Sequence, residues 1–256
     1  MKFMQSYYTD VGNKRSVNQD SLALLKADTE YDEVLLAVIC DGMGGYESGE
    51  LASKTVIEEF VRWFKNELPE MLYDHFDYDV FKASCTRVIR ESNRRLVNYG
   101  NENGIKLGST VTAFFFVDDT YYAAHVGDSR GYEISENSST QITDDHSLIA
   151  YEVRKGILTE ELAKKDKRKN KLVECVGITE RINIDFYSGR TKPDNTYVLC
   201  TDGFWHKIPD EDLIHYLSGK QFKDNEMLKM HLNYLVEQAK LRDETDNISV
   251  LAVIPK

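Results

Sequence analysis

Acidic residues stand at the ends of four apolar stretches in this sequence. Two stretches, residues 34–40 and 197–201, run directly into Asp-Gly pairs. A single Asp-Gly pair after a strand is typical of a tight turn. A carboxylate beside an apolar core is costly unless it is compensated, however, and here the arrangement recurs. The recurrence favours one shared site over four separate turns, and its candidate residues are Asp41, Asp128, Asp202 and Asp246.

Carboxylates gathered at one place indicate a metal site, because like charges at close range cannot all stay ionised without a counter-charge. Oxygen ligands without a neighbouring His or Cys pattern suit Mg²⁺ or Mn²⁺ better than Zn²⁺. Two such ions roughly 3.5 to 4 Å apart polarise a phosphoryl group and lower the pKa of a water between them. Arg15, near the further carboxylate Asp20, could hold a phosphate through two parallel hydrogen bonds. The residues therefore predict a hydrolase that needs no protein nucleophile.

The elements that must position these residues follow from hydrophobic periodicity. Apolar residues at steps of three or four predict amphipathic helices at about 52–64, 81–96 and 228–239. Runs rich in β-branched and aromatic residues predict strands at 22–26, 34–40, 110–117, 121–126, 184–187, 196–200 and 248–254. Strands and helices come in pairs, which favours antiparallel sheets covered by helices over repeated βαβ units. No G-x-G-x-x-G or P-loop motif occurs, so dinucleotide and P-loop chemistry lack support.

Charge and length exclude several classes of function. The 256 residues include 32 Lys and Arg against 43 Asp and Glu, a formal net charge of −11. This balance disfavours nucleic acid or an anionic membrane as partner, because binding a polyphosphate relies on basic residues that displace counterions. No apolar run approaches the roughly 18 residues of a membrane span, and the N-terminus lacks the apolar stretch of a secretion signal. We therefore expect a cytoplasmic protein, and the lack of a linker-like segment favours a single domain.

Residues 147–181 differ in composition from the rest of this acidic chain. The segment contains a basic cluster of Lys164, Lys165, Lys167, Arg168, Lys169 and Lys171. Such a cluster is either a solvated helix face or charged loop, or a basic flap beside an anionic substrate. The residues alone leave both interpretations open.

Seven short motifs in a fixed order carry a resemblance to a known family. They are Arg15 with Asn18-Gln19-Asp20, Asp41-Gly42-Met43-Gly44-Gly45, Gly108-Ser109-Thr110, His125-Val126-Gly127-Asp128-Ser129-Arg130, Asp145-His146-Ser147, Thr201-Asp202-Gly203 and Asp246-Asn247-Ile248-Ser249-Val250. Each motif alone is weak, but the ordered set spans nearly the whole chain. The sequence resembles the metal-dependent serine/threonine protein phosphatases of type 2C, especially their compact bacterial branch.

The resemblance implies a fold, an activity and partners. The fold would be α+β, a two-sheet antiparallel β-sandwich flanked by pairs of α-helices, in one domain over residues 1–256 with a flap subdomain at about 147–181. The activity would be hydrolysis of phosphoserine and phosphothreonine in proteins, by water activated between two Mn²⁺ or Mg²⁺ ions. The partner would be a phosphorylated protein, the product of a serine/threonine kinase. Nothing such as a heptad run points away from a monomer.

The resemblance also implies roles for single residues. Asp41 would bridge the two ions, with the carbonyl of Gly42 on one of them and with Asp202 and Asp246 on the other. Asp20 would act mainly through metal-bound water. Asp128, together with Asp202, would hold a third and weaker metal. Arg15 would bind the substrate phosphate, which makes Arg15, Asp41, Asp202 and Asp246 the expected catalytic set.

Two positions depart from patterns in the family. Gln19 stands where many relatives have Glu, and a neutral amide contributes no charge to a metal site. Met43 stands where animal members carry a His proposed as general acid, and Met cannot donate a proton, so metal-bound water or solvent would protonate the leaving alkoxide. The remaining histidines near these motifs, His125, His146 and His206, are expected to have structural roles.

Two other functions remain compatible with the residues. One is a pseudophosphatase that binds a phosphoprotein without hydrolysing it, although such proteins usually lose metal-binding aspartates and none is missing here. The other is hydrolysis of a small phosphorylated metabolite or nucleotide, which the same metal site could perform. Metal-dependent turnover, and a comparison of phosphopeptides with small phosphate esters, would discriminate among the three.

Overall fold

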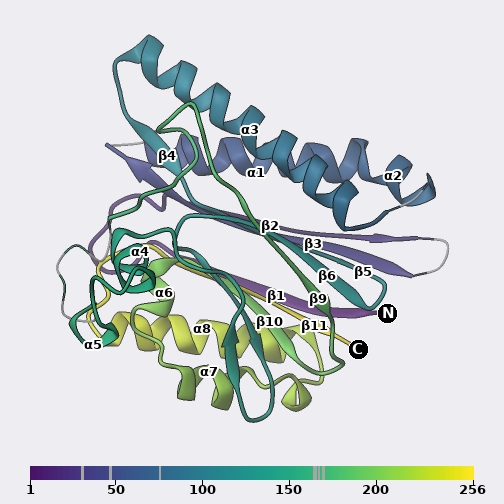
Figure 1. Cartoon of the computed structure of the whole chain (residues 1–256). Helices are drawn as coiled ribbons and strands as arrows, with labels where there is room; N and C mark the ends of the chain where they lie inside the picture. Colours follow the sequence, from purple (N-terminus) through teal and green to yellow (C-terminus); the bar gives the residue numbers. More distant parts are fainter. Residues whose placement is uncertain (30–31, 46–47, 75, 164–165, 167, 169–170) are drawn as a thin grey trace.

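Two antiparallel β-sheets pack face to face, and helices cover the outer face of each sheet (Figure 1). The structure is a computed structural model that describes residues 1–29, 32–45, 48–74, 76–163, 166, 168 and 171–256. Its layers run helix, sheet, sheet, helix, which confirms the α+β sandwich predicted from the sequence.

Strands from distant parts of the chain alternate within each sheet. Within the described residues, the first sheet has the spatial order β1 Phe3–Asp10, β11 Ile248–Pro255, β10 Thr196–Cys200, β7 Arg130–Ile134 and β8 Ser139–Gln141. The second sheet has the order β2 Asp20–Asp28, β3 Glu33–Gly44, β5 Val111–Val117, β6 Thr120–Val126 and β9 Asp185–Arg190, and β4 Leu107–Ser109 pairs with the end of β3. This order brings residues from both ends of the chain to one end of the sandwich.

Three helices cover the second sheet: α1 Ser48–Asn66, α2 Leu68–Asp74 and α3 Tyr78–Asn103. The first sheet is covered by α6 Asp202–Trp205, α7 Asp210–Leu217, the 3₁₀ helix η1 Gly219–Gln221 and α8 Asn225–Leu241. Two short helices, α4 Leu148–Arg154 and α5 Glu160–Ala163, lie in the segment predicted as a flap. Within the described ranges, no helix has the length and hydropathy that a membrane crossing requires.

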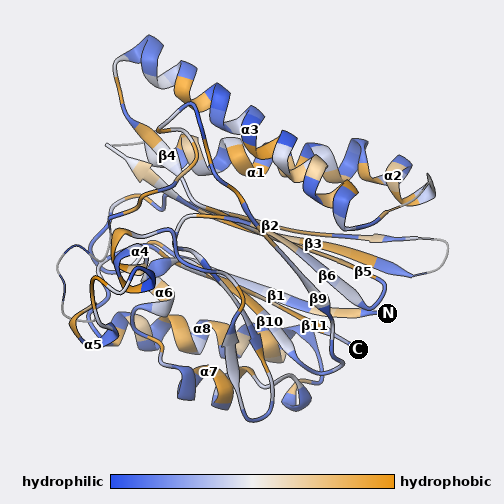
Figure 2. Ribbon diagram, viewed as in Figure 1, coloured by the Kyte–Doolittle hydropathy of each residue, from blue (hydrophilic) through white to orange (hydrophobic). Residues whose placement is uncertain are grey.

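The central strand β3 shows how the sequence separates the layers. Because side chains alternate across a strand, Leu35, Ala37 and Ile39 face the other sheet, where they pack with aromatic side chains such as Phe114. The intervening residues face the helix layer, and they pack against α1 and α3. Both faces of β3 are therefore apolar, and the helices turn their apolar side toward the sheet (Figure 2). A strand buried on both faces holds the residue at its end rigidly in place.

The predicted helices and strands are present, but the expected end of one strand needs correction. Asp41 was expected just beyond the end of a strand, whereas β3 continues through it to Gly44 because Gly42, Met43 and Gly44 pair with β4. Four further strands, β1, β4, β7 and β8, were not predicted from the sequence. The side chains of β1 and β8 are mostly polar or half-exposed, and β4 and β8 are only three residues long, so their pattern is weak.

Candidate active site

A cavity of about 230 Å³ opens where strand ends of the two sheets meet. It is lined by Arg15, Gln19, Asp41, Gly42, Met43, Gly44, Asp128, Leu172, Asp202 and Asp246. All the predicted site residues except Asp20 are in this set. Asp20 lies directly beside Asp41, its partner in the β2–β3 register. The structure thus brings together every residue that the sequence analysis assigned to one site.

Asp20 connects the two sheets beneath the cavity. Asp20 is the first residue of β2, and its amide donates a hydrogen bond to Asn18 Oδ1 at 3.1 Å. The hydroxyl of Thr201, at the end of β10 in the other sheet, donates to Asp20 Oδ2 at 3.0 Å. Thr201 was part of a motif but had no assigned role, and the residue before an Asp-Gly pair carries no sequence signal for such a contact.

Asp41 is held by its backbone, which leaves its carboxylate free for chemistry. Its amide donates to Thr110 Oγ1 at 2.8 Å, and its carbonyl accepts from the Thr110 amide at 2.9 Å. The Thr110 hydroxyl in turn lies 2.7 Å from Ser129 Oγ, beside Asp128. A network of backbone and hydroxyl groups thus fixes the spacing between the β3 and β6 ends of the site.

Gly42 occupies a position that no larger residue can take. A Cβ atom there would lie 2.0 Å from the carbonyl oxygen of Gly49 in α1 and 2.5 Å from that of Gln19. The Gly42 amide donates to the Gln19 carbonyl at 3.1 Å. The close approach places the N-terminal turn of α1 against β3, and it explains why glycine follows Asp41 although the residue is not in a turn.

Asn247 holds the loop that carries Arg15. Its Oδ1 accepts from the Gln19 amide at 2.9 Å, and its Nδ2 donates to the carbonyls of Val11 and Val17 at 2.9 and 3.0 Å. Arg15 therefore reaches the cavity from a clamped loop, and its Nη2 donates to Asp246 Oδ2 at 2.8 Å. The role of Asn247 was not predicted, because one Asn beside an Asp does not indicate which distant backbone it will bind.

A second cluster positions Asp128. The indole of Trp205 donates from Nε1 to the Asp128 carbonyl at 2.9 Å. The guanidinium of Arg130 lies 3.4 Å from the centre of the Trp205 ring and makes two hydrogen bonds to Asp145, at 2.8 and 2.7 Å. Arg130 and Asp145 belong to motifs that the sequence analysis quoted without assigning roles. Together they form a largely buried ion pair that fixes the indole, and so the Asp128 backbone.

We expect Arg130→Ala to lower the free energy of unfolding by about 2–3 kcal/mol, because it leaves the largely buried Asp145 carboxylate without its partner. Urea unfolding followed by far-UV circular dichroism measures this loss. The control is Arg168→Ala, which breaks ion pairs of an exposed guanidinium to Glu152 and Asp166 and should lower the free energy of unfolding much less, because solvent screens exposed pairs. Equal losses in the two variants would contradict a structural role for the Arg130 cluster.

The carboxylates of the site lie in an environment that disfavours their ionised forms. Burial, and then the neighbouring charges of Asp20 and Asp202, raise the pKa of Asp41 well above its usual range. Burial and the charge of Asp128 do the same for the pKa of Asp202. Burial is also the main cause that raises the pKa of Asp20 and that of Asp128 to about 7. Four acidic groups thus share a region in which negative charge exceeds positive charge, because Arg15 pairs with a fifth carboxylate, Asp246, and Arg130 pairs with Asp145.

The donor set fits divalent cations. Asp20 Oδ1 and Asp202 Oδ1 are buried and have no hydrogen-bond partner among the described residues, which is costly for a carboxylate oxygen without a ligand. All the donors are oxygens, the ligands that Mg²⁺ and Mn²⁺ prefer. In the described ranges, no three His, Cys, Asp or Glu side chains lie close enough together to coordinate one metal ion. The carboxylates therefore line the cavity at some distance from one another.

The three neighbouring histidines do not line the cavity. His125 is buried between the hydroxyl of Thr112 at 2.9 Å and the carbonyl of Gly127 at 3.0 Å, and burial lowers its pKa to about 3. His146 packs edge-on against His125 and contacts Asp185 at 3.1 Å. His206 Nδ1 lies 3.8 Å from Asp202 Oδ2. The contacts of His125 and His146 are of the structural kind expected from the sequence, whereas the role of His206, beside Asp202, stays a prediction.

Among its described residues, the predicted flap contributes Leu172 to the cavity. Leu172 lines it and forms an isolated bridge with Ser147, which caps α4. Of the basic cluster, Arg168 is paired with Glu152 and Asp166 at 2.8 Å each. Lys164, Lys165, Lys167 and Lys169 lie outside the described residues, so the choice between a solvated face and a substrate-facing flap stays open for them.

Comparison with known proteins identifies the class of enzyme. The family model described as protein phosphatase 2C matches residues 12–244, and the chain belongs to that family. It is a phosphoprotein phosphatase of the serine/threonine type. The serine/threonine phosphatase stp of Listeria welshimeri is 27% identical over 251 residues, which are 96% of this chain and 94% of the relative.

Two solved structures extend the similarity to three dimensions. The serine/threonine phosphatase of S. agalactiae has a TM-score of 0.87 and 27% identity, with 100% of both chains covered. The catalytic domain of the phosphatase PstP, in complex with two manganese ions, has a TM-score of 0.77 and 25% identity, with 99% of both chains covered.

Proposed function

We propose that this chain removes phosphate from phosphoserine and phosphothreonine by attack of water activated between two Mn²⁺ or Mg²⁺ ions. The observation that carries the proposal is one cavity lined by Arg15, Asp246 and three carboxylates with raised pKa values, Asp41, Asp128 and Asp202, with a fourth such carboxylate, Asp20, beside Asp41. Ionisation of such closely spaced, buried carboxylates is unfavourable in the metal-free protein, and it becomes favourable when bound cations compensate the negative charge. The two manganese ions in the related PstP structure support the same number here.

The residues divide between holding ions and holding substrate. Asp41 and the carbonyl of Gly42, with Asp20 behind them, would hold one ion, and Asp41 with Asp202 and Asp246 would hold the other. Bound divalent ions supply positive charge that polarises the phosphoryl group and lowers the pKa of a water molecule. Whether Asp128 and Asp202 hold a third ion stays a prediction.

Arg15 would orient the phosphate at the open side of the cavity. Its side chain is about half exposed and its loop is clamped by Asn247, so its guanidinium can exchange Asp246 for a phosphate oxygen without moving the backbone. Met43 lines the cavity but cannot donate a proton, and His125 and His146 are turned into the core. The leaving alkoxide would therefore take its proton from metal-bound water or from solvent.

Several finer statements belong to this proposal. Residues 1–256 would form a single phosphatase domain with a flap at about 147–181, and the substrate would be the product of a serine/threonine kinase. A cytoplasmic location and a monomeric state stay predictions. No observation in the described residues favours the pseudophosphatase alternative, because Asp20, Asp41, Asp128, Asp202 and Asp246 are all in place.

The test is turnover of a phosphothreonine peptide with Mn²⁺, with a chelator, and by Arg15→Ala. We expect turnover only with the metal, and a kcat/KM about 10- to 100-fold lower in Arg15→Ala, the loss expected for a hydrogen bond between charged groups. The control is Lys14→Ala, which removes the neighbouring exposed charge and should leave kcat/KM unchanged. Turnover that persists in chelator, or equal kcat/KM in the two variants, would contradict the proposed site. Tight peptide binding without turnover would indicate the pseudophosphatase instead.

A further inference from the structure

We propose that a groove between α3 and the segment preceding β9 binds an acidic stretch of the protein substrate, away from the phosphate that is hydrolysed. The inference rests on the proposed function, because it assumes a protein substrate. The groove has a volume of about 700 Å³. The groups that carry the argument are Arg90, Arg94, Asn98 and Asn101 on α3, and Arg181 and Asn183 on the facing segment.

The donors of α3 form a row along one side of the groove. Arg90, Arg94, Asn98 and Asn101 follow each other at steps of four, four and three residues, which places them on one helix face. At 1.5 Å per residue the row is about 16 Å long. An extended peptide of about five residues has the same length, whereas one phosphate group does not span it. The length favours a peptide over a small anion.

Two of the three arginines that line the groove, Arg90 and Arg181, are not neutralised within the protein, whereas Arg94 pairs with Glu91 at 2.7 Å and Glu180 adds one carboxylate to the lining. Among the described residues, Arg90 and Arg181 have neither an ion pair nor a side-chain hydrogen bond. Every other arginine bonds to a carboxylate or, in Arg154, to a backbone carbonyl. The two exceptions open onto the same groove, in a chain of net charge −11. Guanidinium groups bind carboxylates and phosphates through paired hydrogen bonds, so an acidic peptide is the complementary ligand.

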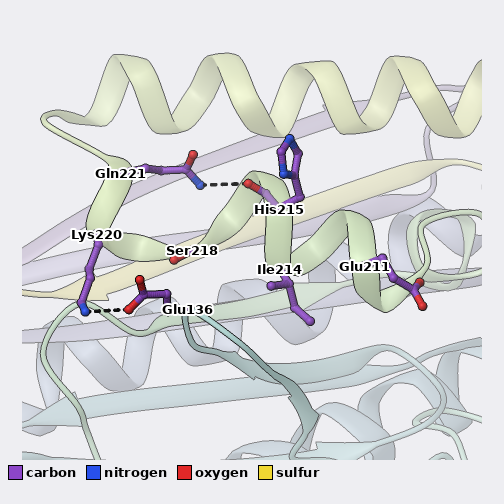
Figure 3. Close-up of a pocket in the computed structure, with 7 residues that line it drawn as sticks. All are labelled: Glu136, Glu211, Ile214, His215, Ser218, Lys220 and Gln221. Carbon is purple, nitrogen blue, oxygen red and sulfur yellow. Dashed lines mark hydrogen bonds and ion pairs between the residues drawn. The ribbon is translucent and has the colours of Figure 1, made fainter.

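A second hollow of similar size lacks this property. It has a volume of about 610 Å³, is lined mainly by α7 and η1, and is shown in Figure 3. Its cation, Lys220, pairs with Glu136 at 2.8 Å, and the Gln221 amide donates to the His215 carbonyl at 3.4 Å. Glu211 points away from both of these groups. The polar groups of that hollow are already paired within the protein or are negatively charged. The two hollows are similar in size, so the groove on α3 differs from the other in its unpaired arginines.

The groove lies against the segment that also borders the active site. Asn93 is buried in the groove wall, where it donates to the Thr179 carbonyl at 2.8 Å and accepts from the Gly177 amide at 2.7 Å. Val176 bonds Ser109 of β4 through two backbone hydrogen bonds of 2.9 Å, and Ser109 pairs with Gly42.

This chain of contacts connects the two sites through few residues. The segment from Leu172, in the active cavity, to Arg181, in the groove, passes beside β4 and α3 on its way to β9 (Figure 1). A substrate could therefore contact both sites along one side of this segment. An acidic stretch in the groove would add affinity and orient the phosphorylated side chain toward Arg15.

The test compares Arg90→Ala/Arg181→Ala with the control Arg87→Ala/Arg190→Ala. The control removes the same charge from exposed arginines that pair outside the groove, with Glu67 and Asp119. Binding of a fluorescein-labelled, glutamate-rich peptide without phosphate is followed by anisotropy in the presence of chelator. We expect Kd to rise at least about tenfold in the groove variant and less than about twofold in the control, with weaker binding at higher salt.

The same variants are then compared in turnover. With Mn²⁺, the kcat/KM of a phosphopeptide with an acidic tail should fall by a similar factor in the groove variant, whereas that of an aryl phosphate should not change. Equal peptide affinity in the two variants would overturn the inference, as would equal losses on both substrates. Binding of inorganic phosphate or ATP by the groove without peptide binding would assign it to a small anion instead. Because anisotropy needs no turnover, failure of the proposed function, seen as absent aryl phosphate hydrolysis, is distinguishable from failure of the groove.

Discussion

Asp41→Asn is expected to abolish phosphatase activity and at the same time to raise the melting temperature of the metal-free protein. The activity should fall more than about 100-fold, because even loss of a partner outside the ligand shell typically costs 10- to 100-fold in a metal site. The stability should rise because the carboxylate lies among Asp20, Asp128 and Asp202, and a neutral amide of the same shape removes the repulsion. An increase of 1 kcal/mol corresponds to about 2–4 °C in a protein of this size.

The two effects are measured by aryl phosphate turnover with Mn²⁺ and by thermal unfolding in chelator. The control is Asp79→Asn, which removes a highly exposed carboxylate at the start of α3 and should change neither quantity. Activity that survives in Asp41→Asn would contradict the role of Asp41. A lower melting temperature in chelator would show that Asp41 supports the metal-free fold, contrary to the electrostatic argument.

Metal removal should make the protein sensitive to rising pH, in the opposite sense to ordinary acid denaturation. The folded-state pKa values of Asp20 and Asp128 are raised to about 7, above the ordinary value of 3.8. Between these values the folded protein binds more protons than the unfolded chain, so these groups stabilise the fold at low pH. Their contribution is lost as pH rises from about 4 through 7.

Bound cations should reverse this loss, so that the stabilisation by Mn²⁺ grows with pH. At 100 to 1,000 times its Kd, one bound ligand adds about 3–4 kcal/mol, or about 6–16 °C. We expect a shift of this size at pH 8 and a clearly smaller one at pH 5, by scanning calorimetry with Mn²⁺ and with chelator at each pH. Groups far from the metal site contribute equally with Mn²⁺ and with chelator, so their contributions cancel in the difference between the two melting temperatures. Asp41→Asn should show a smaller shift at pH 8, and a wild-type shift that is independent of pH would contradict the assignment.

The sequence predicts those elements in which the spacing of apolar residues matches the face that is buried in the folded protein. The helices α1, α3 and α8 follow from apolar residues at helical spacing, because that face is buried against a sheet. The aspartates were identified from the sequence because a carboxylate beside an apolar strand is costly unless a ligand or partner compensates its charge. Their convergence in one cavity depended on the order of the strands, which the ordered motifs and the family resemblance supplied.

The supporting contacts could not be predicted, because they join residues far apart in sequence. Thr201 and Asp20 are 181 positions apart, and Asn247 and Gln19 are 228 positions apart. No local pattern indicates such pairs, since each depends on how β10 and β11 meet the ends of β1 and β2. The continuation of β3 through Asp41 was missed for a related reason. Its partner β4 is three residues long and becomes a strand only through that pairing.

The pairing of β1 with β11 has a consequence during protein synthesis. Thr9 pairs with Ser249 and Asp10 with Ile248, and β1 lies at the edge of its sheet, so β1 has no strand partner until β11 emerges from the ribosome. The loop carrying Arg15 is clamped by Asn247, and Asp246 lies on the same late segment. Contacts of such long sequence separation form slowly. The nascent chain would therefore complete its catalytic centre only after residues 246–249 have emerged, and chains that lack them would be inactive toward phosphoproteins.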